Sequence, residues 1–424
     1  MQSPGSVPGL PHNFGLRVSR LVRQISWLEV VLLLVALALA TAMRIVMLDF
    51  KSLDYFASLK PWYNSIKDGG FAVFATGFST YNPPYLYILY LIARFLPDLP
   101  TETAVKIPAL FSDFVCACFV FLIVRSQLPH RAALPYLAAL TMLFAPTVVL
   151  NSAFWGQADS IYTAGILACV YFLGIRRPIL AVFGFSCGLA IKLQAVFLLP
   201  LLLAMTIRGR IPRKALILIP LVLFLAILPS LLAGRPAGEL LGVYAYQASQ
   251  FETLTMNAPT VFALVPDTKR VFNLLYTPGV LLGAAVALLW FTLLVRSRRH
   301  LEGMLLAEAA VVSMLLIPLF LPKMHERYFF PADILAICLA FLEPALYFVP
   351  IVVVGISFFA YQPFLFDRTY VPLPILALVL IAVTAFLTHR AASRLYAQSG
   401  PQSELNSTLP AASEARQEPG SDLR

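Results

Sequence analysis

Ionisable side chains interrupt a strongly apolar chain at only a few places, and chemistry could occur there. Asp49 and Asp54 follow the first apolar run and open a long segment that closes with Tyr81-Asn-Pro-Pro-Tyr85. A carboxylate beside an apolar surface can accept a proton from an acceptor hydroxyl, and its pKa responds to its surroundings. The alternative for Asp54 is a helix N-cap. Asp54 is the stronger candidate base, because Asp49 lies closest to the end of the apolar run.

A third acid, Asp159, follows Trp155 and Gln157 at the end of another apolar run. A Trp ring can stack on a sugar face, while Gln and Asp side chains bind hydroxyl groups. Trp155, Gln157 and Asp159 are therefore candidate ligands of a sugar or an acceptor. The alternative for Asp159 is a helix N-cap beside a Trp at the membrane interface.

Three ionisable residues in a row, His325, Glu326 and Arg327, lie between two apolar runs. Charges at such a position are costly unless they are paired or used. Arg offers a fork of N–H groups to a phosphate, and Lys or protonated His adds donors, so His325 and Arg327 are candidate phosphate ligands. Lys192 and Asp113 also interrupt apolar segments. The alternatives are a solvated loop for the first cluster and a mutual ion pair for Lys192 and Asp113.

Several common catalytic motifs are absent from the sequence. It has no Gly-rich phosphate loop, no Walker motif and no His-x-x-x-His pair, and its five cysteines all fall inside apolar runs without metal-binding spacing. ATP-driven and zinc-dependent chemistry therefore have no support in the sequence. We expect no cofactor and leave a divalent metal open.

The elements that position these residues must be membrane helices. The chain of 424 residues is 60% hydrophobic and 12% charged, and its mean hydropathy is +0.82, which excludes a soluble protein. Its net charge of +10 is spread between apolar runs and forms no basic patch, so we expect no nucleic-acid partner. We predict an all-α polytopic membrane protein with about twelve transmembrane helices. The expected spans are 26–47, 104–124, 132–150, 158–175, 178–191, 194–207, 214–233, 279–295, 303–321, 331–343, 345–361 and 371–388.

Groups of Lys and Arg before the first span and after alternate later spans predict the orientation, since cytoplasmic loops are enriched in these residues. These groups include Arg17, Arg20 and Arg23, Arg125 and Arg131, Arg176 and Arg177, Arg208 and Arg210, Arg296, Arg298 and Arg299, and Arg390 and Arg394. Both termini are then cytoplasmic. We expect a cytoplasmic basic N-terminus (1–25), a membrane domain (26–388) and a disordered cytoplasmic tail (389–424).

Two long segments, 48–103 and 234–278, then face outward, as do the shorter segments 151–160 and 322–331. The apolar stretch 85–96 is too short to cross a membrane, at about 18 Å of helix. We therefore expect it to be a short helix in the outer interface of the first outward loop, where Tyr rings are favourable.

The ordered set of motifs resembles the GT-C class of integral-membrane glycosyltransferases, over about residues 26–388. Among these it is most similar to bacterial relatives of the second mannosyltransferase of GPI-anchor synthesis. The motifs are Tyr81-Asn-Pro-Pro-Tyr85, Lys106-Ile-Pro108 with Asp113, Phe154-Trp-Gly-Gln-Ala-Asp-Ser160, Gly188-Leu-Ala-Ile-Lys192-Leu-Gln194, Asn257-Ala-Pro259 and Met324-His-Glu-Arg-Tyr-Phe-Phe-Pro331.

This resemblance implies inverting transfer of a sugar, a hexose such as mannose, from a polyprenyl-phosphate sugar donor to a lipid or glycan acceptor. The protein would lie among membrane lipids in a bacterial inner (cytoplasmic) membrane, with its site facing the periplasm or exterior. Asp54 best matches the general base of the class. The donor phosphate falls to His325 and Arg327, together with Lys192.

The resemblance also adds Tyr81, Asn82 and Asn257 to the sugar or acceptor ligands, although relatives often carry Asp where Asn82 stands. Two alternatives remain open: a twelve-span transporter or lipid flippase, and a non-catalytic assembly subunit.

Overall fold

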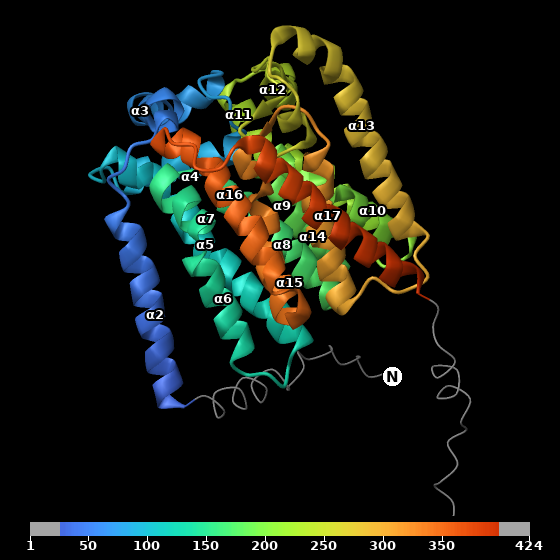
Figure 1. Cartoon of the computed structure of the whole chain (residues 1–424). Coiled ribbons are helices and arrows are strands. Elements are labelled where there is room, and N and C mark those ends of the chain that lie inside the picture. The colour runs from blue at the N-terminus through green and yellow to red at the C-terminus, as the bar shows by residue number, and fades with distance from the viewer. Residues whose placement is uncertain (1–25, 398–424) are drawn as a thin grey trace, which may run out of the picture.

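The computed structural model describes residues 26–397, and within them the chain is almost entirely helical (Figure 1). The helices are α2 (Trp27–Val46), α3 (Lys60–Gly69), α4 (Pro83–Phe95), α5 (Thr101–Gln127), α6 (Leu134–Phe144), α7 (Pro146–Val149), α8 (Asp159–Gly174), α9 (Pro178–Ile191), α10 (Leu199–Ile207), α11 (Leu218–Ala233), α12 (Ala237–Ser249), α13 (Lys269–Val295), α14 (Gly303–Leu319), α15 (Phe330–Leu342), α16 (Phe348–Phe366) and α17 (Leu373–Tyr396). Two short strands, β1 (Thr255–Met256) and β2 (Met324–His325), pair in parallel. The predicted all-α class is confirmed.

Six helical segments of the described chain are long and apolar enough to cross a membrane. They are α2, α5, Arg213–Ala233, α13, Pro344–Phe366 and α17. A seventh results if α6 and the helical segment Pro146–Trp155 are taken as one span that bends by 51°. The bend lies at Ala145, before Pro146, where a helix is easily interrupted because proline lacks an N–H and restricts the preceding residue. We expected a single span over 132–150 in this region.

Shorter apolar helices occupy the centre of the molecule. All but a few side chains of α8, α14 and α15 are buried, as in a helix that is apolar on all sides and packed within a bundle. α8 and α9 approach each other closely, because a Cβ atom on Gly165 would lie 2.6 Å from the carbonyl oxygen of Gly184. Small residues at such a contact allow two helix backbones to approach within van der Waals distance.

The segments that were expected to face outward gather at one end of the bundle, the upper end in Figure 1. α3, α4 and α12 lie there. Gln247 of α12 donates a hydrogen bond to the carbonyl oxygen of Thr80. β1 and β2 bring 255–256 beside 324–325, although the two strands are far apart in the sequence. The expected helix at 85–96 is present as α4.

The basic groups meet at the opposite end. Arg176, after α8, and Arg210, after α10, both pair with Glu302, just before α14. Arg208 donates hydrogen bonds to the carbonyl oxygens of Val295, Ser297 and Arg299, in the connection from α13 to α14. The Lys and Arg groups therefore mark a common end of the helices that precede them, as their spacing in the sequence indicated.

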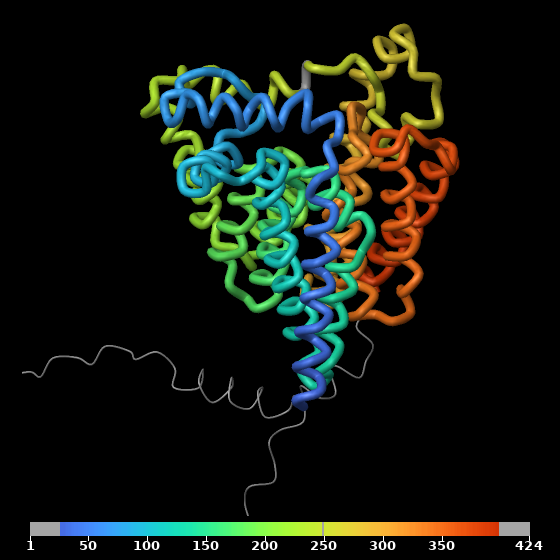
Figure 2. The backbone as a smooth tube through the Cα atoms, turned by 90° about the vertical axis from the view of Figure 1, so that its left-hand side faces the viewer, coloured from blue at the N-terminus to red at the C-terminus, as the bar shows by residue number. Residues whose placement is uncertain are grey.

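A buried ion pair attaches the peripheral helix α2, which stands at the left edge of the bundle in Figure 1 and in front of it in Figure 2. The Arg44 Nε donates to Asp113 Oδ2 at 2.9 Å, and both side chains are buried. Ser152 and Ser160 each donate to the same carboxylate at 2.5 Å. The possible pair between Asp113 and Lys192 is therefore wrong, because Asp113 is fully occupied by α2 and by the two serines.

The ends of the chain differ in part from expectation. The basic N-terminus, 1–25, and residues 398–424 of the expected tail lie outside the described residues. α17 continues to Tyr396, so the disorder expected from residue 389 is wrong for 389–396. The expected outward segment 234–278 also contains helical structure, because it holds α12 and the first turns of α13.

Candidate active site

Asp54 is held by two side chains from the segment after α7. Its Oδ2 accepts hydrogen bonds from Trp155 Nε1 at 2.8 Å and from Gln157 Nε2 at 2.7 Å. Asp54 occupies the position before a helical turn, Tyr55–Leu59, but its side chain makes no capping hydrogen bond. The N-cap alternative is therefore wrong. No described residue hydrogen-bonds to Oδ1, and 31% of the side chain is exposed, so one oxygen is fixed and the other is accessible.

A tight turn at Gly156 brings both donors to Asp54. Gly156 has a φ of +82°, the left-handed conformation that glycine adopts without strain, and it separates Trp155 from Gln157. A Cβ atom here would lie 3.2 Å from Cγ of Lys106, so the turn also needs the space that glycine leaves. A larger residue at 156 would displace the two groups that fix the carboxylate.

Lys106 fixes the chain that leads to Asp54, a role that the sequence did not reveal. Its Nζ donates to the carbonyl oxygens of Met47, Leu48 and Phe50, at 3.2, 2.7 and 2.7 Å. These carbonyls follow the end of α2, and of the three only that of Met47 also accepts a backbone hydrogen bond within the described chain, from Phe50 N at 3.4 Å. The only signal in the sequence was the Lys106-Ile-Pro108 motif, whose spacing says nothing of a contact 56 residues back along the chain.

Trp155 does not present a ring face to a ligand. The indole is fully buried. It stacks on Phe364 with ring centroids 4.8 Å apart, contacts Tyr361 edge-on, and lies 5.4 Å from the guanidinium of Arg327. The expected sugar-stacking role does not fit this environment, because protein groups already cover the ring. Trp155 instead positions Asp54 through its Nε1.

Asp159 joins the two cations of the site. It is fully buried, and Lys192 Nζ donates to its Oδ1 at 2.6 Å while Asn151 Nδ2 donates to its Oδ2 at 2.9 Å. Arg327 Nε lies 3.6 Å from Oδ2. The N-cap of α8 is Ala158, and the Asp159 side chain makes no capping contact, so that alternative is wrong. Direct binding of a sugar hydroxyl does not fit either, since both oxygens are occupied.

Arg327 is the least satisfied group of the site. Its NH1 lies 3.9 Å from Asp54 Oδ2, and its side chain is 11% exposed. It makes no hydrogen bond with any described residue, and its buried Nε has no acceptor. A guanidinium carries five N–H donors, and leaving them unmet in a buried site is costly. The solvated-loop alternative is wrong for Arg327, and the group is suited to receive an anion with two oxygens.

His325 sits beside Arg327, in a largely buried position. Burial, together with the positive charge of Arg327, lowers the pKa of His325 below its usual 6.5. A protonated His325 is therefore disfavoured near neutral pH, and its part in binding a phosphate stays a prediction. Its ring packs edge-on against Phe251 and Tyr328. Asn257, with a φ of +54°, lies next to His325 through a backbone bridge.

Tyr81 and Asn82 belong to the wall of the site. The Tyr81 hydroxyl donates to Oε1 of Gln157 at 3.1 Å, and its ring lies 5.3 Å from Lys192 Nζ. The buried Asn82 donates to the carbonyl oxygen of Ala190 at 3.0 Å and to the Tyr244 hydroxyl. Asn82 therefore ties the start of α4 to α9 and α12.

Tyr244 is a second residue that the sequence did not single out. Burial raises the pKa of its phenol to about 12, so it remains neutral and donates to the carbonyl oxygen of Leu189 at 2.6 Å. It lies in α12, far from α4 and α9 in the sequence, and it is unremarkable among the tyrosines of the chain.

Asp49, the other carboxylate after α2, stays apart from this network. It is exposed, and no described residue forms a hydrogen bond or ion pair with it. The structure thus brings Asp54, Gln157, Asp159, Lys192 and Arg327 together and leaves Asp49 outside. No group of three or more His, Cys, Asp or Glu residues within 26–397 is arranged to hold a metal ion.

No protein-family model matches the chain, and a search of curated proteins finds no match. The functional argument therefore depends on the chemistry of the site. That chemistry combines a carboxylate with one accessible oxygen, a guanidinium with unmet donors 3.9 Å away, and a buried lysine held by Asp159. Such a set can accept a proton on one side and stabilise an anionic leaving group on the other.

Proposed function

We propose that the protein is a GT-C-like glycosyltransferase. It transfers a hexose such as mannose from a polyprenyl-phosphate sugar to a lipid or glycan acceptor, with inversion at the anomeric carbon. The single observation that carries this proposal is the placement of the unsatisfied Arg327 beside Asp54, whose carboxylate is fixed through Oδ2. Arg327 would stabilise a phosphate leaving group, and Asp54 would accept the proton of an acceptor hydroxyl.

In the proposed reaction, the acceptor oxygen attacks the anomeric carbon from the face opposite the phosphate. Asp54 Oδ1 takes the hydroxyl proton as the new C–O bond forms. The bond between the anomeric carbon and the phosphate oxygen breaks, and its electron pair stays on the phosphate. Arg327 stabilises the charge that develops there, because its N–H groups lie in a buried site where electrostatic interactions are strong.

Lys192 and Asp159 prepare Arg327 for this role. Asp159 holds both cations, so the site remains close to electrical balance before the donor arrives. Lys192 also has N–H groups beyond the one given to Asp159, since an ammonium has three donors. Gln157 and Trp155 keep Asp54 oriented. This arrangement supports catalysis through positioning and electrostatic stabilisation, with the groups in place before reaction.

We further propose that all of the expected spans, about twelve in number, lie in the membrane, and that the shortest of them end before its outer surface. The 14-residue α9 is roughly 21 Å long, shorter than a ~30 Å hydrocarbon core. It ends at Ile191, next to Lys192, and α8 begins at Asp159. Helices that stop inside a membrane protein leave polar backbone and side chains around a recess. The site then lies below the outer surface, at the depth of a lipid-phosphate headgroup.

The orientation follows from the basic end. That end carries Arg176, Arg208 and Arg210, so it is proposed to face the cytoplasm. The Asp54 end then faces the periplasm or exterior of a bacterial inner membrane, and α3 and α4 lie along that surface.

The proposal is tested by comparing Asp54→Asn with Asp49→Asn. Asparagine at position 54 keeps the shape of the side chain and can still accept from Trp155, but it cannot take a proton. Turnover should fall roughly 10²–10⁴-fold in Asp54→Asn and stay near wild type in Asp49→Asn, the matched control. Binding of the donor should be retained in both variants. Normal turnover by Asp54→Asn would remove Asp54 from the role of base.

A further inference from the structure

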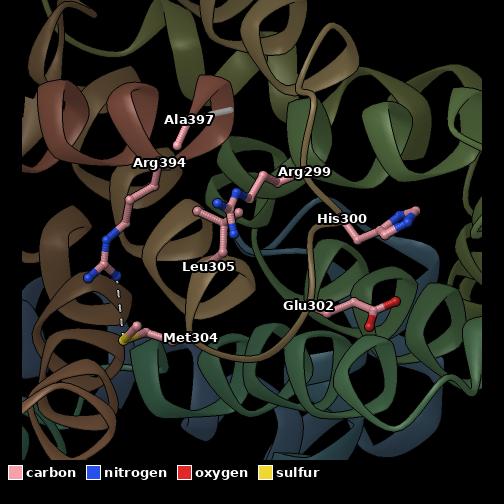
Figure 3. A pocket seen from close by; sticks show the side chains of 7 residues that line it. All are labelled: Arg299, His300, Glu302, Met304, Leu305, Arg394 and Ala397. Atoms are coloured by element: carbon pink, nitrogen blue, oxygen red, sulfur yellow. Dashed lines mark hydrogen bonds between the residues drawn. The ribbon is translucent and has the colours of Figure 1, made fainter. Parts of the chain in front are cut away.

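A recess lies at the basic end of the molecule, away from Asp54. It is a hollow of about 450 Å³ between the α13–α14 connection and the end of α17 (Figure 3). Arg299 and His300 line it from the connection, and Arg394 lines it from α17. Met304 and Leu305, in the first turn of α14, form its apolar side. Cationic and apolar groups thus meet in one recess.

The charge around this recess is unbalanced. Five arginines and three glutamates line it or contact a residue that does: Arg176, Arg208, Arg210, Arg299 and Arg394, with Glu302, Glu308 and Glu343. The glutamates are taken by particular partners. Glu302 pairs with Arg176 and Arg210, while Arg394 pairs with Glu308 and Glu343. No described residue pairs with the side chain of Arg299.

The recess is also rigidly built. Arg208 donates to three carbonyl oxygens of the connection, and the backbone N–H of Arg298 donates to the carbonyl oxygen of Leu395 in α17. These bonds fix the connection against both α10 and α17. Arg394 NH1 contacts the sulfur of Met304 at 3.5 Å, which places a cation directly over the apolar side (Figure 3).

We propose that this recess binds the phosphate of an anionic phospholipid from the cytoplasmic leaflet. Arg299 and Arg394 contact the phosphate, and Met304 and Leu305 contact the start of an acyl chain. The lipid source is favoured over a free anion because the recess lies at the ends of α13 and α17, two of the membrane-length helices. Basic pockets between transmembrane helices at the cytoplasmic side bind such headgroups. This inference rests on the proposed orientation of the basic end but not on sugar transfer at Asp54.

The test compares thermal unfolding of the full chain in nanodiscs of phosphatidylcholine alone and in nanodiscs that also contain phosphatidylglycerol. A lipid that binds the folded protein and is present in large excess should raise the Tm by roughly 3 °C for a chain of this length. Arg299→Glu should abolish the rise, since it places a negative charge in the recess. The matched control is Arg131→Glu, an exposed basic residue between α5 and α6, which should keep the rise.

A third arm adds millimolar inorganic phosphate to the phosphatidylcholine nanodiscs and should leave the Tm unchanged. An equal rise with inorganic phosphate would overturn the lipid assignment in favour of a free anion. The proposal also fails if phosphatidylglycerol stabilises wild type and Arg299→Glu equally, or if it stabilises neither. Arg299→Glu should fold in phosphatidylcholine as wild type does, because its side chain has no described partner to lose.

Discussion

The buried pair of Asp159 and Lys192 gives the sharpest prediction about the architecture of the site. Asp159 Oδ1 and Lys192 Nζ lie 2.6 Å apart, and their side chains are 0% and 9% exposed. Asp159→Asn keeps the shape but removes the only negative charge that Lys192 contacts among residues 26–397. Breaking one side of a buried pair costs about 3–5 kcal/mol, because the remaining charge is left uncompensated. We expect the free energy of unfolding to fall by this amount.

The double variant of Asp159→Asn with Lys192→Met separates the cost of the unpaired charge from the loss of packing. Lys192→Met alone should cost less than Asp159→Asn, since Asp159 keeps Arg327 and Asn151. Asp159→Asn combined with Lys192→Met should be more stable than the sum of the two single losses predicts. The expected coupling is about 0.5–3 kcal/mol, the range for residues in one hydrogen-bond or salt-bridge network.

The assay is reversible chemical unfolding in mixed micelles, followed by Trp fluorescence. The control cycle uses the exposed pair of Lys269 and Glu252, whose side chains are 76% and 66% exposed. Exposed pairs contribute about 0.2–1 kcal/mol, so this cycle should show little coupling. Coupling of Asp159 and Lys192 no larger than that of the control would refute the argument that Asp159 holds the cations of the site.

Three further predictions concern ligand binding and orientation. Arg327→Ala should weaken binding of a polyprenyl-phosphate sugar by about 10–100-fold in a titration, because a hydrogen bond to a charged group is lost. Arg327→Lys should weaken binding less. Equal affinity in wild type and Arg327→Ala would remove Arg327 from the phosphate site. Because the pKa of His325 is lowered below 6.5, its positive charge appears only as pH falls through that lowered value. Donor affinity of wild type should therefore rise as pH falls below 6.5. His325→Gln should lack the rise, and a flat wild-type profile would remove His325 from the phosphate site. Single cysteines at the exposed positions Asp98 and Gly238, in a background without other cysteines, should react with an impermeant maleimide from outside, whereas one at His130 should not; the reverse labelling would invert the proposed topology.

The lowered pKa of His325 also predicts how the stability of the protein depends on pH. The unfolded chain takes up a proton at His325 near pH 6.5, while the folded protein resists it to a lower pH. The contribution of His325 to the free energy of unfolding is therefore present above the pKa of the unfolded state and is lost as pH falls below it.

The helices were largely predictable because their signals are local. Long apolar runs anticipated α2, α5 and α17, and Ser26 with Glu29 forms a capping box at the start of α2. The basic groups anticipated which helix ends lie together. Such signals need only the spacing of residues along one segment.

The partners of the buried charges were not predictable in the same way. Arg44 and Asp113 are separated by 69 residues, and Asp54 and Gln157 by 103. Which acid meets which cation depends on how α2, α5 and α8 pack, and no local pattern encodes that packing. The residue types indicated a site, and the structure brings several of these residues together, but the role of Trp155 depends on Phe364 and Tyr361 covering its ring.

Transfer of label is the most direct test of the central claim. Purified protein in proteoliposomes receives a polyprenyl-phosphate hexose labelled in the sugar, together with a membrane lipid extract as acceptor. The proposed function predicts a labelled product of inverted anomeric configuration with wild type and almost none with Asp54→Asn. Absence of product with wild type, together with movement of the labelled lipid across the bilayer, would contradict the account and identify a transporter or flippase instead.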